Sequence, residues 1–158
     1  MFIKPDYNLK NVYEIDFNEL KAQGIKSIML DLDSTIMISK SATLLPETLA
    51  WFDTFMKDFE VAIISNNKSA KYIENASRIA PCRVIGRANK PNPAVMKAYL
   101  DDMGIKPEEA VMVGDRPLTD ILAGKFLGCK TILVGSINQK ETWPTRLVRA
   151  LERSTIKK

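Results

Sequence analysis

The sequence contains no histidine among its 158 residues, and this absence narrows the chemistry open to the protein. Ser-His-Asp catalysis, Cys-His catalysis and histidine-ligated zinc are excluded. Any general acid or base must then be a carboxylate, a lysine, a tyrosine or a cysteine. Cysteine is scarce too. Cys82 and Cys129 show no CxxC spacing and are typical of reduced, partly buried thiols in a cytosolic protein.

Long hydrophobic runs are also missing. No apolar stretch approaches the roughly 20 residues that span a bilayer, and the N-terminus shows no signal pattern. We therefore expect a cytoplasmic protein that at most contacts a membrane surface peripherally. The net charge of +4 mildly favours anionic partners. No basic patch is interleaved with aromatic residues, so nucleic acid is not an expected partner.

Short apolar runs alternate with amphipathic segments along the chain, whose length predicts a single domain over residues 1–158. The predicted strands are Ser27–Leu32, Glu60–Ser65, Arg83–Ile85, Ala110–Gly114 and Lys130–Val134. The predicted helices are Phe17–Gln23, Pro46–Lys57, Ser69–Ser77, Pro93–Met103, Thr119–Leu127 and Pro144–Glu152. This alternation favours a doubly wound α/β fold around a mostly parallel, five-stranded sheet. Such sheets bind ligands at the carboxyl ends of their strands.

Asp31 and Asp33 directly follow the first predicted strand. Two carboxylates this close raise each other's pKa, and burying them without a partner is costly. A divalent cation neutralises such a pair and attracts a further anion such as a phosphate. A polar turn is the alternative. In phosphoryl transfer, Asp31 suits the nucleophile and Asp33 the general acid/base, and Thr35 would hydrogen-bond near the turn.

Two more strand ends carry groups that suit a phosphate. Ser65 and Asn66 follow the second strand, where a hydroxyl and backbone amides at a helix start could bind phosphate oxygens. A plain helix cap is the alternative. Lys90 precedes a proline after the third strand, where it could neutralise charge on a transferred phosphoryl group. A solvated lysine is the alternative there.

The fourth strand ends at Gly114-Asp115. Gly114 permits a tight turn, and Asp115 offers a hard oxygen ligand for Mg²⁺. Asp120 could support the metal shell or pair with Lys90, although Thr119 or Asp120 could simply cap a helix. Four such features in this order, each at a predicted strand end, indicate a phosphoryl-transfer site.

These residues resemble the four motifs of the haloacid dehalogenase (HAD) superfamily. The resemblance implies a Rossmann-like three-layer sandwich and Mg²⁺-dependent attack by Asp31 that forms a phosphoaspartyl intermediate. It implies that Asp33 protonates the leaving oxygen and then activates water. It also implies a metal held by Asp31, the main-chain carbonyl of Asp33, and Asp115, and a phosphoryl group bound by a set of polar side chains: Thr35, Ser65, Asn66 and Lys90.

A narrower resemblance links the chain to the YqeG family of class IIIA phosphatases. It rests on Pro5-Asp6-Tyr7, on the segment from Leu20 into the first motif, and on the run Gly114–Gly124. That family is related to the phosphatidylglycerophosphate phosphatases of organelles. Ser34 departs from the family pattern, which usually has asparagine there, and this change puts only local loop geometry in doubt.

The segments that hold a cap domain in many HAD enzymes are short here, at Ile36–Leu45 and Gly86–Lys90. We therefore expect a capless core with an open site. An open site needs a lid from a neighbouring subunit, a large substrate, or a substrate held at a surface. A lipid phosphate fits the last two. Apolar residues at helical spacing beside basic ones near the C-terminus could lie at an anionic membrane or pack on the sheet: Trp143, Leu147, Val148 and Leu151.

The sequence thus predicts a Mg²⁺-dependent phosphomonoesterase, with phosphatidylglycerophosphate as the expected substrate. One alternative is a capless phosphatase for a soluble sugar phosphate or a phosphoprotein, in which oligomerisation supplies the lid. Another is a non-catalytic binding module on the same scaffold. A receiver domain is disfavoured, because it would carry its phosphorylated aspartate at the third strand.

Overall fold

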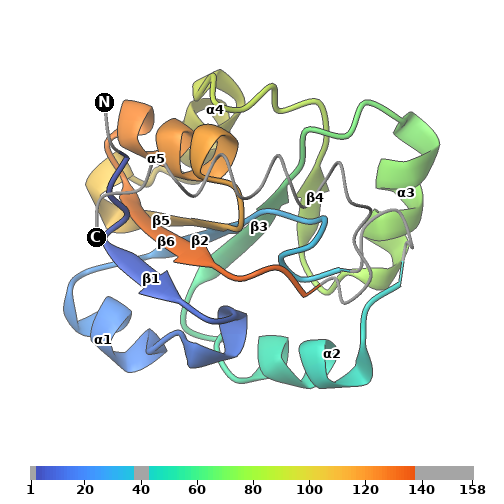
Figure 1. The fold of residues 1–158 in the computed structure, drawn as a ribbon, viewed down its shortest axis with the longest axis horizontal. Helices are drawn as coiled ribbons and strands as arrows, with labels where there is room; N and C mark the ends of the chain where they lie inside the picture. The colour runs from blue at the N-terminus through green and yellow to red at the C-terminus, as the bar shows by residue number, and fades with distance from the viewer. Residues whose placement is uncertain (1–2, 38–42, 138–158) are drawn as a thin grey trace.

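The computed structural model of the protein describes residues 3–37 and 43–137, and these form an α/β sandwich (Figure 1). Six parallel strands make one sheet in the order β1-β6-β5-β2-β3-β4. They are β1 (Tyr7–Leu9), β2 (Ser27–Leu30), β3 (Glu60–Ile64), β4 (Arg83–Ile85), β5 (Ala110–Gly114) and β6 (Lys130–Val134). The helices are α1 (Phe17–Ala22), α2 (Pro46–Asp53), α3 (Ala70–Ile79), α4 (Ala94–Met103) and α5 (Leu122–Leu127).

The α/β class and the five predicted strands are confirmed, with ends that differ by at most two residues. The prediction of a five-stranded sheet was wrong, because β1 adds a sixth strand at the edge beside β6. β1 is only three residues long and alternates partly buried with exposed positions. Its sequence is therefore too short to give a recognisable strand pattern. The predicted helix Pro144–Glu152 lies outside the described residues.

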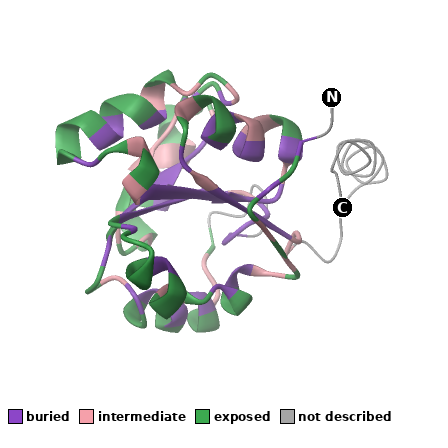
Figure 2. Ribbon diagram, turned by 90° about the vertical axis from the view of Figure 1, so that its left-hand side faces the viewer, coloured by how far each residue is buried: buried purple, intermediate pink, exposed green. Residues whose placement is uncertain are grey.

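The sheet is covered by helices on both faces, with its buried strands running between the two layers (Figure 2). One face packs against α1, α2 and α3 through a cluster that includes Ile28, Leu30 and Phe52. The other packs against α4 and α5 through a cluster that includes Met29 and Met96. Successive residues of β2 thus face opposite layers, which explains why its sequence is apolar throughout.

An aromatic cluster joins α1 to the segment around α2. Phe17 and Phe55 stack with ring centroids 4.0 Å apart, and Trp51 meets Phe55 edge-on at 4.7 Å. Asp16 caps α1 by accepting a hydrogen bond from the backbone N–H of Glu19 at 3.0 Å. This packing holds α1 and α2 against one face of β2, the strand that leads into Asp31.

Strand order reverses between β2 and β5. From β2 the chain builds outward through β3 to β4, then returns to place β5 on the other side of β2. The register pairs Leu30 with both Ile63 and Val113, so all three strands end at the same level. The residues that follow them therefore meet at one edge of the sheet, where open α/β sheets bind ligands.

The described part of the chain contains no helix long and apolar enough to cross a membrane. Near the N-terminus, Ile3 is buried in a small cluster with Ile121 and Leu133. Ile3 therefore contributes to the core of the domain.

Candidate active site

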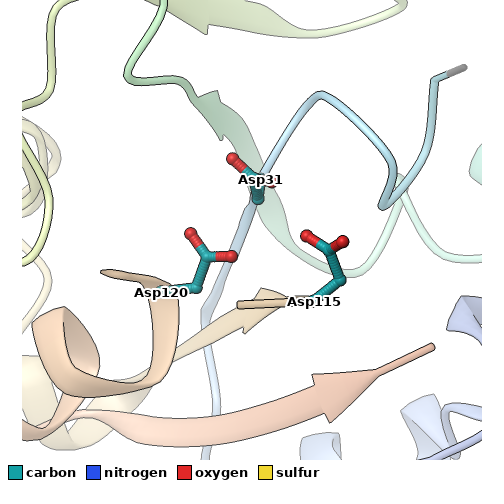
Figure 3. Close-up of side chains that lie close together, drawn as sticks. All are labelled: Asp31, Asp115 and Asp120. Atoms are coloured by element: carbon teal, nitrogen blue, oxygen red, sulfur yellow. The ribbon is translucent and has the colours of Figure 1, made fainter. Parts of the chain in front are cut away.

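Three carboxylates converge at the reversal of strand order (Figure 3). Asp31 follows β2, Asp115 follows β5, and Asp120 belongs to a π-helical turn at Pro117–Ile121. Each offers an oxygen within 4.8 Å of the others. The side chain of Asp31 is 13% exposed, and that of Asp120 only 1%. Three carboxylates this close and this buried require a compensating positive charge.

Lys90 supplies part of that charge. Its ammonium donates to Asp31 Oδ1 at 2.7 Å, to Asp120 Oδ1 at 2.7 Å and to the carbonyl of Ile64 at 2.8 Å. These three contacts use all of its donors. Burial opposes the charged form, but the nearby Asp120 and Asp31 outweigh burial and raise the pKa of Lys90 above its ordinary value of 10.5. Lys90 is therefore a fixed cation in the centre of the site.

The three carboxylates and the Lys90 ammonium together carry a net charge of −2 when all four groups are ionised. Burial, followed by repulsion from Asp31, raises the pKa of Asp120 to about 6 despite its contact with Lys90. Hard oxygen donors with a net negative charge fit a divalent cation such as Mg²⁺. Asp120 is already engaged through both oxygens, because its Oδ2 also accepts from the backbone N–H of Arg116 at 3.2 Å. Asp31 and Asp115 are better placed to bind a metal directly.

Thr35 lies beside two of the three clustered carboxylates. Its side chain is fully buried, and its hydroxyl lies 3.2 Å from Asp115 Oδ1 and 3.4 Å from Asp31 Oδ2. A hydroxyl has one proton, so it donates to one of these carboxylates at a time. In this arrangement Thr35 positions the two carboxylates.

Ser65 and Asn66 sit beside Lys90 at the end of β3. The Asn66 side chain donates to the Lys90 carbonyl at 3.0 Å and accepts from the Lys90 N–H at 2.7 Å. Asn66 therefore clamps the backbone at Lys90. Ser65 accepts a hydrogen bond from the backbone N–H of Asn67 at 3.1 Å. A plain helix cap does not describe either residue, because α3 is capped by Ser69.

A pocket of about 230 Å³ opens at this point. Its wall includes most of the polar side chains predicted from the sequence: Asp31, Asp33, Ser65, Asn66, Lys90 and Asp120. The structure thus gathers these residues around one cavity. Their chemical roles stay predictions.

Comparison with known proteins places the chain in a family. A family model described as HAD-hydrolase-like matches residues 87–151. The chain is 31% identical over 153 residues to the probable phosphatase YqeG of Bacillus subtilis, and this match covers 96% of the chain and 88% of that protein. The chain belongs to the HAD hydrolase family. It is also 28% identical over 170 residues to phosphatidylglycerophosphate phosphatase 1 of Arabidopsis thaliana, covering 99% of the chain but only 48% of that protein.

Solved structures show the same fold. A protein of Listeria monocytogenes aligns with a TM-score of 0.61 at 15% identity, covering 76% of this chain and 88% of its own. A HAD family enzyme of Bacteroides thetaiotaomicron, solved with magnesium and inorganic phosphate, aligns with a TM-score of 0.56 at 14% identity. That match covers 77% of this chain and 99% of the neighbour. At these identities the likeness establishes the HAD fold alone.

The HAD site contains a contact that sequence reasoning missed. The hydroxyl of Tyr72, on α3, donates to Asp33 Oδ1 at 2.5 Å and lies 3.6 Å from the sulfur of Met37. A tyrosine on an amphipathic helix is ordinarily a packing residue, so its sequence gave no signal. The contact links the Asp33 side chain to α3.

We expect Tyr72→Phe to lower kcat about 3- to 10-fold while KM changes less than about 2-fold, because the variant loses one hydrogen bond that positions Asp33. Steady-state kinetics with a phosphomonoester would measure this. Tyr13→Phe is the matched control, since the Tyr13 hydroxyl contacts Thr48 on α2. Equal losses in the two variants would show that Tyr72 acts only through packing.

At Gly114 the sequence predicted a tight turn but not the close approach of Asp120. A side-chain carbon at this position would lie 2.2 Å from Asp120 Oδ2, so only glycine fits against that carboxylate. The π-helical turn carries Asp120 back over the end of β5, an irregularity that is frequent at functional sites.

We expect Gly114→Ala to displace Asp120 and thereby loosen Lys90. Overpacking of this kind costs about 1–3 kcal/mol, and activity should fall at least about 10-fold. Thermal unfolding and phosphate release would test both effects. Gly104→Ala is a control for backbone strain alone, because Gly104 has a φ of 69° but no atom within 4 Å of an added side-chain carbon. A Gly114 variant with unchanged activity would contradict the role given to this contact.

Proposed function

We propose that this protein is a Mg²⁺-dependent phosphomonoesterase that acts through an aspartyl phosphate on Asp31. The observation that carries the proposal is the cluster of Asp31, Asp115 and Asp120 around the buried ammonium of Lys90. It combines a carboxylate nucleophile, donors for a divalent cation, and a fixed positive charge in one pocket. Membership of the HAD hydrolase family and similarity to a probable phosphatase support it.

The proposed reaction has two steps. A carboxylate oxygen of Asp31 attacks phosphorus, and the bond from phosphorus to the leaving oxygen breaks. Asp33 gives a proton to that oxygen. It then accepts a proton from the water that attacks the aspartyl phosphate, which releases inorganic phosphate and restores Asp31. Lys90 orients Asp31 and supplies positive charge close to the transferred group.

The metal would be held by Asp31, Asp115 and the main-chain carbonyl of Asp33, with Asp120 supporting the site through Lys90. When bound, it supplies positive charge that screens the phosphoryl oxygens from the carboxylates. Asp33 would contribute only its main-chain carbonyl, because its side chain accepts a hydrogen bond from Tyr72 and is not one of the three clustered carboxylates. Ser65, Asn66 and Lys90 are proposed to bind the phosphoryl group.

We propose phosphatidylglycerophosphate as the substrate. The similarity to the Arabidopsis phosphatidylglycerophosphate phosphatase supports this choice. The short loop from Gly86 to Pro93 between β4 and α4 supports it as well, because it contains no cap domain. A lipid headgroup held at a surface would not need such a cap.

The deciding experiment measures inorganic phosphate released from phosphatidylglycerophosphate in mixed micelles, with Mg²⁺ or with EDTA. Glycerol 3-phosphate, a sugar phosphate and a phosphoserine peptide serve as soluble comparisons. Metal-dependent release that is greatest with the lipid is the expected result. Greater release from a soluble ester would keep the phosphatase and overturn the lipid substrate, whereas no release from any ester would overturn the phosphatase proposal.

A further inference from the structure

A second hollow adjoins the catalytic pocket. Its volume is about 420 Å³, and its lining residues are Asn66, Lys68, Arg87 and Asn89. Asn66 lines both hollows, so they are neighbours across one side chain. We call the second one the cationic pocket, because two cations and two amides line it and no carboxylate does among the residues described.

Hydrogen bonds between two loops hold the cationic pocket in shape. The loop after β4 binds the loop after β3 through the Arg87 N–H to the Asn67 carbonyl, at 3.0 Å, and the Ala88 N–H to the Ser65 carbonyl, also at 3.0 Å. The Arg87 guanidinium also donates to the carbonyl of Lys68 at 3.3 Å. The two cations therefore project from the loops after β3 and β4, which are hydrogen-bonded to each other and also carry Ser65 and Lys90.

The charges of this pocket are not balanced from within the described part of the chain. Neither Lys68 nor Arg87 forms an ion pair with a carboxylate of residues 3–37 or 43–137. Both side chains are exposed to solvent. The helix α3 begins just after Lys68 and directs the positive end of its dipole toward the same region. The cationic pocket is therefore suited to an anion.

The backbone conformation of Arg87 gives independent support. Its φ of 53° lies in the left-handed region, which is strained for a residue other than glycine or asparagine. Asn89, at 55°, is a residue type that tolerates this conformation. A turn alone would be satisfied more cheaply by glycine at position 87, so the strained arginine suggests that its side chain is used.

We propose that the cationic pocket binds a second anionic group of the substrate, a phosphodiester or phosphate on the leaving-group side of the scissile ester. This inference rests on the proposed phosphatase function. Lys68 and Arg87 contact the second anion, while Asp31 and Lys90 act on the first. The pocket thus makes the enzyme selective for substrates that carry two anionic groups, whether the second belongs to a lipid headgroup or to a soluble ester.

The test compares kcat/KM for substrates that differ in the second anion. Glycerol 3-phosphate has none, and glycerophosphoglycerophosphate has a phosphodiester in soluble form. Phosphatidylglycerophosphate in mixed micelles has the same phosphodiester in a lipid, and fructose 1,6-bisphosphate against fructose 6-phosphate tests a second phosphate. The variants are Lys68→Ala, Arg87→Asn and the double variant. Asparagine suits the left-handed backbone at position 87, so the charge is removed without added strain.

We expect each single variant to lose about 5- to 10-fold in kcat/KM on substrates with a second anion, and the double variant about 25- to 100-fold. All variants should stay within about 2-fold of wild type on glycerol 3-phosphate. Lys68→Ala should leave thermal stability unchanged, and Arg87→Asn should not lower it, because asparagine tolerates the left-handed backbone. The losses should shrink as salt is added, since the contacts are solvent-exposed. Lys57→Ala is the matched control, because Lys57 is exposed and lies just before β3, at the opposite end of that strand.

The arms of the test separate its outcomes. Losses on both phosphodiester substrates support a phosphodiester ligand, and losses on the bisphosphate alone support a soluble second phosphate. Equal losses on all substrates, or no losses, overturn the cationic pocket while leaving the phosphatase intact. A loss confined to micelles also overturns it, because it shows attraction to a surface and no binding in the pocket. If wild-type protein releases no phosphate from any ester, the proposed phosphatase function itself is overturned.

Discussion

Replacing Asp31 by asparagine is expected to reduce phosphate release by at least about 10⁴-fold. The two side chains have nearly the same shape, and the amide oxygen can still accept a hydrogen bond from Lys90. A neutral amide, however, is too weak a nucleophile to attack phosphorus. The variant also loses a charged ligand for the metal, so a higher Mg²⁺ concentration should not restore turnover.

The same substitution should not weaken the fold. In EDTA it removes one of three carboxylates that lie within 4.8 Å of each other, so the unfolding temperature is expected to stay the same or to rise. Asp53→Asn, at an exposed position of α2, is the matched control and should leave activity unchanged. A purified Asp31 variant that keeps more than a few per cent of wild-type turnover would rule out the covalent mechanism.

The sequence predicted the edge of the sheet where the site lies because strand ends are set locally. Asp31, Ser65 and Asp115 each follow an apolar run that stops at a polar residue. Parallel strands of equal register bring those ends together. The pairing of Asp120 with Lys90 was one of three alternatives raised by the sequence, and the structure shows this contact at 2.7 Å.

What the sequence could not supply depends on contacts between distant segments. Tyr72 reaches Asp33 across 39 positions, and no local pattern distinguishes it from a core tyrosine. The π-helical turn was predicted as the start of an ordinary helix. It has no sequence signature of its own and is packed against Gly114. The contact of the Thr35 hydroxyl with two carboxylates likewise depends on the fold.

Replacing Lys90 by methionine is expected to cause the largest loss of stability among these variants. Lys90 is 1% exposed and is the shared partner of Asp31 and Asp120. Removing one partner of a buried ion pair costs about 3–5 kcal/mol, because a buried charge is left uncompensated. For a domain of this size that corresponds to a fall of roughly 6–20 °C in Tm. Lys97→Met, which breaks only an exposed pair with Asp101, should cost less than about 0.5 kcal/mol.

The loss should depend on pH in a defined direction. Burial and repulsion already raise the pKa of Asp120 to about 6, and removing Lys90 takes away the charge that opposes this rise. A carboxyl group whose pKa is higher in the folded state contributes its full stabilisation only below its unfolded pKa, here 3.8. That stabilisation is lost as the pH rises through the folded pKa. The Tm deficit of Lys90→Met should therefore be larger at pH 8 than at pH 5.

Added Mg²⁺ and a second substitution at Asp120 test why Lys90→Met loses stability. Because Mg²⁺ can replace the missing positive charge, adding it should raise the Tm of Lys90→Met by more than it raises that of wild type. The double variant Lys90→Met/Asp120→Asn removes the uncompensated carboxylate and should recover a substantial part of the stability without recovering turnover. If Asp120→Asn fails to restore stability, and if the deficit is the same at both pH values, then Lys90 stabilises the fold by packing. Its ammonium would then not be the charge that holds the three carboxylates together.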